Sequence, residues 1–375
     1  MSSRSFLAAL LVASLQASPP GGRPRARDLG IAPGVLQPGP LNAITDVAGV
    51  RVGHVTLTGG DTVRTGVTAI LPHGGNLFQS KVPGGVFVGN AFGKLAGSTQ
   101  VHELGTIETP IVLTNTLAVG PAIDGVVAWT LAQPGNEQVR SVNALVGETN
   151  DAGLNDIRGG HVTRAHVVEA IRTAAAGPVL EGAVGAGTGT TAFGWKAGIG
   201  TSSRQVRVGN EQWTVGALVQ ANFGGRLTIA GVPVWRELTP GERPAAARPE
   251  ADGSCMIVVG TDAPLDARNL ERLAARAVFA MARTGSTYSN GSGDFAIAFS
   301  THASLRVIGD LTPQARTTLP TDAVSGLFEA VLDATEEAIY NSLLRATDTT
   351  GRGVASKAIP IDGLRKVLSL YGRKG

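Results

Sequence analysis

Short stretches of alternating apolar and polar residues, or of continuous apolar residues, recur along the chain and predict β-strands. The first two stretches flank the turn-forming sequence Gly59-Gly60-Asp61, which favours a hairpin. We also expect residues 226–234 to pair with a long strand at 213–222. The predicted strands are 50–57, 65–71, 84–90, 110–115, 141–148, 213–222, 255–260 and 294–300.

Helices are predicted between these strands, where apolar residues recur at helical spacing. Pro121 suits the first turn of a helix that runs to Leu131. The other expected helices begin at Thr163, at Asp266 and at Thr321 or Asp322. Strands joined by hairpins, with helices between them, indicate an α/β (α+β) fold in which layered sheets are covered by helices. We find no internal repeat and no apolar run of transmembrane length.

The first 27 residues differ in composition from the rest of the chain. A short positive start at Arg4, an apolar run over Phe6–Leu15 and small residues near Ala17 resemble a secretory signal. Residues 19–27 are rich in Pro, Gly and Arg, and we expect them to be disordered. The expected organisation is a signal peptide and disordered leader at 1–27, then a single catalytic domain at 28–375. The protein is then expected to be periplasmic or secreted. The alternative is a cytoplasmic protein with an N-terminal extension that is not a signal peptide.

Composition excludes several classes of function. The net charge is +3 and only 5% of residues are aromatic, with arginines scattered along the chain, so we expect no nucleic-acid partner. The six histidines lack the spacing of a metal site, and we expect no metal and no cofactor. A Gly-x-Ser-x-Gly elbow is also missing from the sequence, which argues against an α/β-hydrolase.

The stretch with the clearest chemistry is Asp252-Gly253-Ser254-Cys255, where a polar, Pro-rich segment at 236–250 meets an apolar strand. The preceding segment is expected to be a mobile loop. The Ser254 hydroxyl could attack the Gly253 carbonyl, and hydrolysis would leave Ser254 as a new N-terminus. Its α-amine, with a pKa of about 7.7, would suit a general base. Alternatively, Gly-Ser is an ordinary turn before a strand. Cys255, the single cysteine, is better explained as a small buried hydrophobe than as a nucleophile.

Five segments of the chain resemble the L-aminopeptidase/D-esterase family, relatives of the β-peptidyl aminopeptidases and N-terminal-nucleophile-like serine hydrolases. They are Pro40–Asp46, Gly49–His54, Gly66–Pro72, Asp252–Val259 and Ser289–Asp294, in the family's order. The resemblance implies self-cleavage between Gly253 and Ser254 into chains 28–253 and 254–375, with Ser254 as the nucleophile. It also implies a four-layer α-β-β-α sandwich, shared with ornithine acetyltransferases, and a homotetramer of cleaved protomers.

Four more residues could act with this serine. Ser292 and Asp294 lie two apart at the start of a strand, so they share a face; alternatively, they belong to a simple turn. Asn222 ends an apolar strand and could donate to an oxyanion or merely cap the strand. Glu148 ends another strand and could pair with a substrate ammonium or be solvated. The resemblance implies the relay, oxyanion and ammonium-binding roles, and leaves open whether the base is the Ser254 α-amine or the relay.

The leading hypothesis is therefore a self-processing aminopeptidase that hydrolyses amides, esters and short peptides carrying a free amine. The Gly/Thr-rich stretch 185–191 is expected to line its pocket. One alternative is an acyltransferase of the ornithine acetyltransferase type, against which the serine counts because those enzymes use threonine. Another is a non-enzymatic secreted binding protein. The sequence leaves the preferred side chain, and the use of β-amino acids, open. We expect no membrane partner.

Overall fold

The computed structural model describes residues 22–240, 253–309 and 311–373. The predicted signal and most of the predicted loop at 236–250 lie outside the described residues. The expectation of disorder is wrong for residues 22–27, which pack against the domain. Ala26 is fully buried, and Arg25 donates hydrogen bonds to the carbonyls of Asn42 and Thr201. Guanidinium groups can bind several carbonyls at once, which the composition of the segment did not reveal.

The first sheet has five strands in the order β1-β2-β6-β7-β4. The predicted hairpin is confirmed, with β1 and β2 antiparallel from Arg51 opposite Leu71 to Gly59 opposite Val63. β6 and β7 run parallel, and β7 starts later than predicted. The strands are β1 (Arg51–Gly59), β2 (Val63–Leu71), β4 (Leu95–Ala96), β6 (Ile111–Asn115) and β7 (Leu145–Thr149).

The second sheet has the order β10-β11-β12-β13-β3-β14, with β5 also paired to β3. β12 and β13 are parallel to each other, and the other pairs are antiparallel. The strands are β3 (Ser80–Ala91), β5 (Thr106–Ile107), β10 (Ile199–Val208), β11 (Glu211–Asn222), β12 (Ser254–Thr261), β13 (Gly293–Ser300) and β14 (Val307–Ile308).

The predicted pairing of residues 226–234 with the strand at 213–222 is wrong. The neighbours of β11 are β10 and β12, and residues 226–234 form only isolated bridges and the start of a short helix, α4 (Val234–Glu237). The true partner, β10, contains the polar sequence Thr201-Ser202-Ser203-Arg204, which does not follow the apolar pattern of a buried strand. Its polar side chains are nonetheless buried, because they hydrogen-bond to neighbouring segments.

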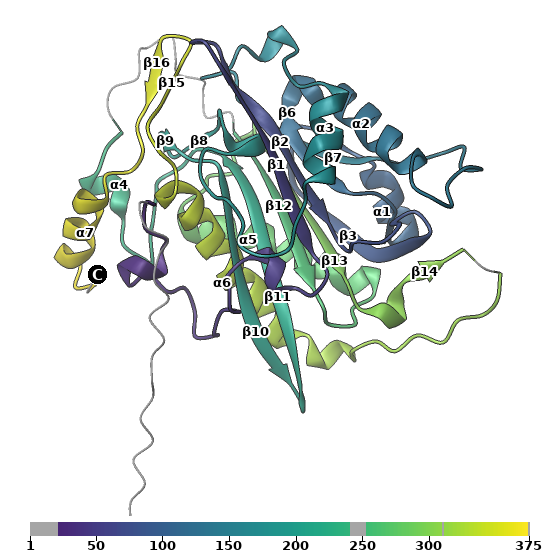
Figure 1. The fold of residues 1–375 in the computed structure, drawn as a ribbon. Helices are drawn as coiled ribbons and strands as arrows, with labels where there is room; N and C mark the ends of the chain where they lie inside the picture. Colours follow the sequence, from purple (N-terminus) through teal and green to yellow (C-terminus); the bar gives the residue numbers. More distant parts are fainter. Residues whose placement is uncertain (1–21, 241–252, 310, 374–375) are drawn as a thin grey trace, which may run out of the picture.

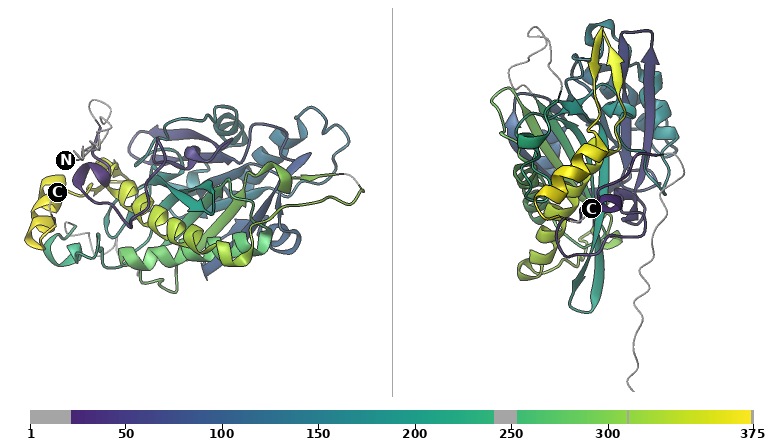
Figure 2. Two further views of the ribbon diagram at one scale, coloured as in Figure 1. Left: turned by 90° about the horizontal axis from the view of Figure 1, so that it is seen from below. Right: turned by 90° about the vertical axis from the view of Figure 1, so that its left-hand side faces the viewer.

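The alternation along the strands produces four layers, as predicted. In β12, Met256 and Val258 point into the core between the two sheets, whereas Ile257 and Val259 point to the helices that cover the second sheet. Helices cover the outer side of each sheet (Figures 1 and 2). They are α2 (Val119–Leu131) and α3 (Arg164–Arg172) over the first sheet, and α5 (Ala267–Thr284) and α6 (Ser325–Leu344) over the second.

Smaller elements surround these layers. Two two-stranded hairpins, β8–β9 and β15–β16, lie outside the main sheets, and short helices precede β5 and end the chain. These elements are α1 (Ser98–Leu104), β8 (Thr191–Ala192), β9 (Trp195–Lys196), β15 (Thr349–Gly351), β16 (Val354–Ser356) and α7 (Ile361–Leu370).

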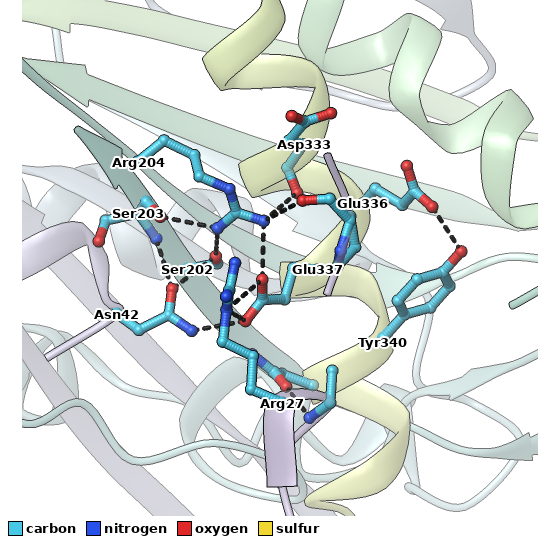
Figure 3. A network of polar contacts seen from close by, with 12 residues as sticks. Arg27, Asn42, Ser202, Ser203, Arg204, Asp333, Glu336, Glu337 and Tyr340 are labelled. Atoms are coloured by element: carbon cyan, nitrogen blue, oxygen red, sulfur yellow. Dashed lines mark hydrogen bonds and ion pairs between the residues drawn. The ribbon is translucent and has the colours of Figure 1, made fainter. Parts of the chain in front are cut away.

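A buried ion pair fastens the N-terminal segment to β10 and α6 (Figure 3). Arg204 and Glu337 are fully buried, with Arg204 Nη2 2.7 Å from Glu337 Oε2. Arg27 Nε lies 3.1 Å from each oxygen of Glu337, and Asn42 Nδ2 lies 2.5 Å from Oε1. The carboxylate is therefore fully bonded, which is the condition under which a buried charge is tolerated.

We expect Arg204→Met to lower the free energy of unfolding by about 3–5 kcal/mol, because it leaves the Glu337 carboxylate buried with only part of its compensation. The matched control is Arg365→Met, which removes an exposed ion pair to Asp362 at 3.3 Å and should change stability by under about 0.5 kcal/mol. Chemical denaturation measures both. Equal effects of the two substitutions would contradict the assignment of stability to the buried pair.

Candidate active site

A pocket of about 820 Å³ opens where β7 and β11 end and β12 begins. Four of the residues singled out from the sequence line it: Glu148, Asn222, Gly253 and Ser254. The Gly/Thr-rich stretch contributes Gly189 and Thr191, as expected. Much of the remaining wall comes from the end of β3 and the segment after it, from Asn150 and residues 152–154, and from the β15–β16 hairpin.

Ser254 is the first residue of β12 and is 4% exposed. Alternation along the strand turns its side chain to the same face as Met256, toward the first sheet and the pocket. Its Oγ has no hydrogen-bond partner among the described residues. Cys255 lies on the opposite face, in the core beneath the helices, and burial raises the pKa of its thiol well above the usual range. The Ser254 hydroxyl therefore reaches the pocket, whereas the Cys255 thiol does not.

Asn222 lies directly opposite Ser254 in the β11–β12 ladder. Its Oδ1 accepts a hydrogen bond of 3.1 Å from the backbone N–H of Thr191. Because this bond uses the oxygen, it fixes the amide so that the NH₂ group remains as a donor at the pocket wall. An amide donor directly across the ladder from the Ser254 hydroxyl is the type of group that can stabilise an oxyanion.

Asp294 lies in β13, the strand next to β12, and Ser292 directly precedes that strand. The β12–β13 register places Ser254 opposite Gly293 and Cys255 opposite Asp294. Ser292 Oγ donates to Asp294 Oδ1 at 2.8 Å, so these two side chains are paired, whereas Ser254 is not hydrogen-bonded to Ser292. Burial raises the pKa of Asp294 to about 6, opposed by the hydrogen bonds from Ser292 and from the Cys255 backbone.

Glu148 lies at the end of β7 and is 2% exposed. Its Oε1 accepts from the backbone N–H of Lys94 at 3.0 Å, and its Oε2 accepts from the Thr116 hydroxyl. The Lys94 ammonium is 3.5 Å from Oε1, on a half-exposed side chain. Glu148 is therefore a buried carboxylate at the pocket wall, and the half-exposed Lys94 ammonium compensates part of its charge.

Sequence reasoning missed several residues of the pocket. Lys94 lies in the loop after β3 and Thr116 begins a short 3-10 helix after β6, and the composition of these segments gave no sign of a role, although both residues contact Glu148. Arg352 stands in the β15–β16 hairpin, far along the chain, where its left-handed backbone (φ +53°) and hydrogen bond to the Ala152 carbonyl hold it at the pocket. Only the fold reveals such a contact, since no local pattern encodes it.

Within the described ranges, no group of three or more His, Cys, Asp or Glu side chains could hold a metal ion. In the same ranges, no helix is long and apolar enough to cross a membrane. The pocket instead offers a buried hydroxyl, an amide donor and a carboxylate. A hydroxyl, an amide donor and a carboxylate around one pocket are groups that a serine hydrolase needs.

The chain belongs to peptidase family S58, whose model matches residues 42–356. It is 44% identical over 379 residues to β-peptidyl aminopeptidase BapA of Sphingosinicella microcystinivorans, covering 93% of each chain. The family membership confirms the resemblance seen in the sequence and the prediction of a serine aminopeptidase, a hydrolase. Neither alternative, acyltransferase or binding protein, is favoured by these relatives.

Solved structures share the fold over nearly the whole chain. A β-aminopeptidase from a Burkholderia species is 40% identical, with a TM-score of 0.85, and covers 94% of this chain and 100% of its own. The L-aminopeptidase D-Ala-esterase/amidase of Ochrobactrum anthropi is 37% identical, with a TM-score of 0.87 and the same coverage. That protein is described as a prototype of the serine aminopeptidases and a variant of the Ntn hydrolase fold.

We expect kcat/KM to fall about tenfold per pH unit below about pH 6, because the pair with Ser292 needs Asp294 ionised to accept a proton. Asp294→Asn should reduce activity and abolish this acid limb.

The same carboxyl should affect stability. The pKa of Asp294 in the folded state is above the ordinary value of 3.8, so the folded state binds more protons than the unfolded state between about pH 4 and 6. Asp294 therefore lowers the stability of the folded state as pH rises through this window. Asp294→Asn should therefore also flatten the dependence of Tm on pH in this window.

The control is Asp151→Asn, because burial also raises the pKa of Asp151 to about 6. Asp151 hydrogen-bonds Asn155 and does not line the pocket. Its removal should leave the acid limb in place. An acid limb that persists in Asp294→Asn and vanishes in Asp151→Asn would overturn the assignment.

Proposed function

We propose that this protein is a self-processing serine aminopeptidase in which Ser254 attacks first its own chain and then the substrate. The observation that carries the proposal is the Ser254 hydroxyl at the pocket wall, which lies directly opposite Asn222 and has no hydrogen-bond partner among the described residues. A hydroxyl that faces a pocket and is not engaged by a neighbouring side chain can attack a carbonyl held there.

The bond between Gly253 and Ser254 has features that suit self-cleavage. The Gly253 carbonyl accepts a hydrogen bond of 3.1 Å from the Gly293 N–H, which polarises it. A Cβ at position 253 would approach Phe223 Cα to 2.7 Å, so only glycine fits without a shift. Ser254 Oγ adds to this carbonyl, the peptide C–N bond breaks to release the α-amine, and water hydrolyses the resulting ester to a Gly253 carboxylate.

The same groups then hydrolyse a substrate. Ser254 Oγ attacks the substrate carbonyl, Asn222 donates to the oxyanion, and the leaving amine or alcohol departs before water releases the acyl group. Two groups compete for the role of base: the new α-amine of Ser254, and the Ser292–Asp294 pair. The acyl portion carries the free amine, whose ammonium pairs with Glu148 after Lys94 moves aside.

The proposed substrates are amides, esters and short peptides of small L-amino acids or β-amino acids. Their acyl portions are short enough for an ammonium at Glu148 and a carbonyl at Ser254 to share one pocket. Names of the relatives support both kinds, since they include β-peptidyl aminopeptidases and an L-aminopeptidase. We further propose export, from the signal-like start, and a homotetramer of cleaved protomers, from the family resemblance.

The wild-type protein should separate into two chains that begin at or after residue 18 and at Ser254, whereas Ser254→Ala should remain one inactive chain. Cys255→Ala is the matched control and should cleave normally, because its side chain points away from the pocket. Denaturing mass spectrometry measures processing and leader removal together, and native mass spectrometry gives the oligomer. Cleavage of Ser254→Ala at the same bond would refute the intramolecular mechanism, and an intact residue 1–17 segment would refute export.

Ala-p-nitroanilide should be hydrolysed with a kcat/KM at least about 10²-fold above that of N-acetyl-Ala-p-nitroanilide, since the acetylated substrate leaves the site of the ammonium unfilled. Glu148→Gln should lose most of this preference. Glu108→Gln, at a buried carboxylate bound by Asn143 and distant from the pocket lining, should keep it. Equal kcat/KM for the two substrates in the wild-type enzyme would rule out ammonium recognition.

A further inference from the structure

Lys196 is a fully buried lysine beneath the Gly/Thr-rich stretch that borders the pocket. It ends the β8–β9 hairpin and pairs with Thr191 in the ladder. Its Nζ donates to three backbone carbonyls: Gly187 at 3.1 Å, Thr190 at 2.9 Å and Ala197 at 2.5 Å. An ammonium has three N–H donors, so each of them has a partner within one short segment.

Burial of the charged form of this lysine costs folding free energy. Burial lowers the pKa of Lys196 to about 7, and Asp151 is the charged group close enough to favour its ammonium form. No carboxylate bonds directly to Nζ among the described contacts, where only carbonyls accept its protons. An apolar side chain of similar length would fill the same space without this penalty. The hydrogen bonds from the ammonium instead fix the backbone conformation of residues 187–191.

That segment in turn holds Asn222. The Thr191 N–H donates to Asn222 Oδ1 at 3.1 Å, which orients the amide. The Phe193 N–H donates to the Phe223 carbonyl at 2.8 Å, one residue further on. The hairpin is thus attached to the end of β11 at Asn222 and at Phe223, and Lys196 binds the segment that leads into the hairpin.

We propose that Lys196 is a positioning residue for the oxyanion donor: it shapes residues 187–191 so that the Thr191 N–H holds the Asn222 amide toward Ser254. The inference rests on the proposed role of Asn222 in catalysis. Lys196 does not touch the substrate, because it is fully buried and is not part of the pocket wall. Its effect should therefore fall on kcat and be transmitted entirely through Asn222.

The test is a double-mutant cycle on folded, cleaved enzyme with Ala-p-nitroanilide. Asn222→Ala alone should lower kcat by about 10²–10³-fold, the loss usual for one oxyanion donor. Lys196→Met should lower kcat by about 10–10²-fold with KM changed by less than about threefold, since small misplacements of a catalytic group have such effects. The double variant should be no slower than Asn222→Ala alone, because Lys196 acts through that side chain.

Lys357→Met is the matched control. The Lys357 carbonyl accepts a hydrogen bond from the backbone N–H of Lys196, so the two lysines lie in the same region. The Lys357 ammonium, however, is exposed and bonds Asp348 instead of the carbonyls of residues 187–191. It should leave kcat unchanged. If Lys196→Met impairs folding or cleavage, Lys196→Gln, which retains two donors, replaces it in the cycle and should lie between the wild type and the expected Met effect.

The outcomes separate the two proposals. Multiplicative losses in the double variant, or a wild-type kcat in Lys196→Met, would overturn the positioning role while the drop in Asn222→Ala still supports the proposed function. A normal kcat in Asn222→Ala would refute the oxyanion role and the inference that rests on it. A loss in Lys357→Met equal to that in Lys196→Met would show a general disturbance of the region and would also overturn the inference.

Discussion

The register of three neighbouring strands is the constraint on which the site depends. The β11–β12 ladder sets Ser254 opposite Asn222, and the β12–β13 ladder sets it opposite Gly293. A shift of one residue in either ladder would turn the Ser254 hydroxyl to the side covered by the helices, or would move Asn222 away from its position opposite Ser254. The register is strongly specified because β12 is buried along all of its 8 residues, with apolar side chains on both faces.

The burial of charged groups near these strands lowers the free energy of unfolding. Asp294 and Asp151 have their pKa values raised to about 6 by burial, and that of Lys196 is lowered to about 7. Each group disfavours the folded state in its charged form. By contrast, the Glu337 carboxylate, which is not part of the pocket wall, accepts hydrogen bonds from Arg27, Asn42 and Arg204. Its charge is therefore compensated more directly than the charges of the buried groups near the site.

Sequence patterns predicted the elements whose structure depends on residues close together in the chain. The hairpin at Gly59–Asp61, the helix capped by Asp266 and the strand after Ser254 follow from turn residues, caps and apolar runs. β10 was missed because its inward residues are polar and are satisfied only by distant segments. Lys94 and Arg352 reach the site through contacts between segments far apart in the chain, which no spacing in the sequence encodes.

The same arrangement explains how a chain can be cut at Ser254 and keep its fold. β12 is hydrogen-bonded to β11 on one side and to β13 on the other, so the sheet does not rely on the peptide bond before Ser254. Packing of α5 and α6 on this sheet adds contacts on both sides of the cut, since β10 and β11 precede it and both helices follow it. Cleavage would therefore free an α-amine at the pocket while the interactions that position it remain.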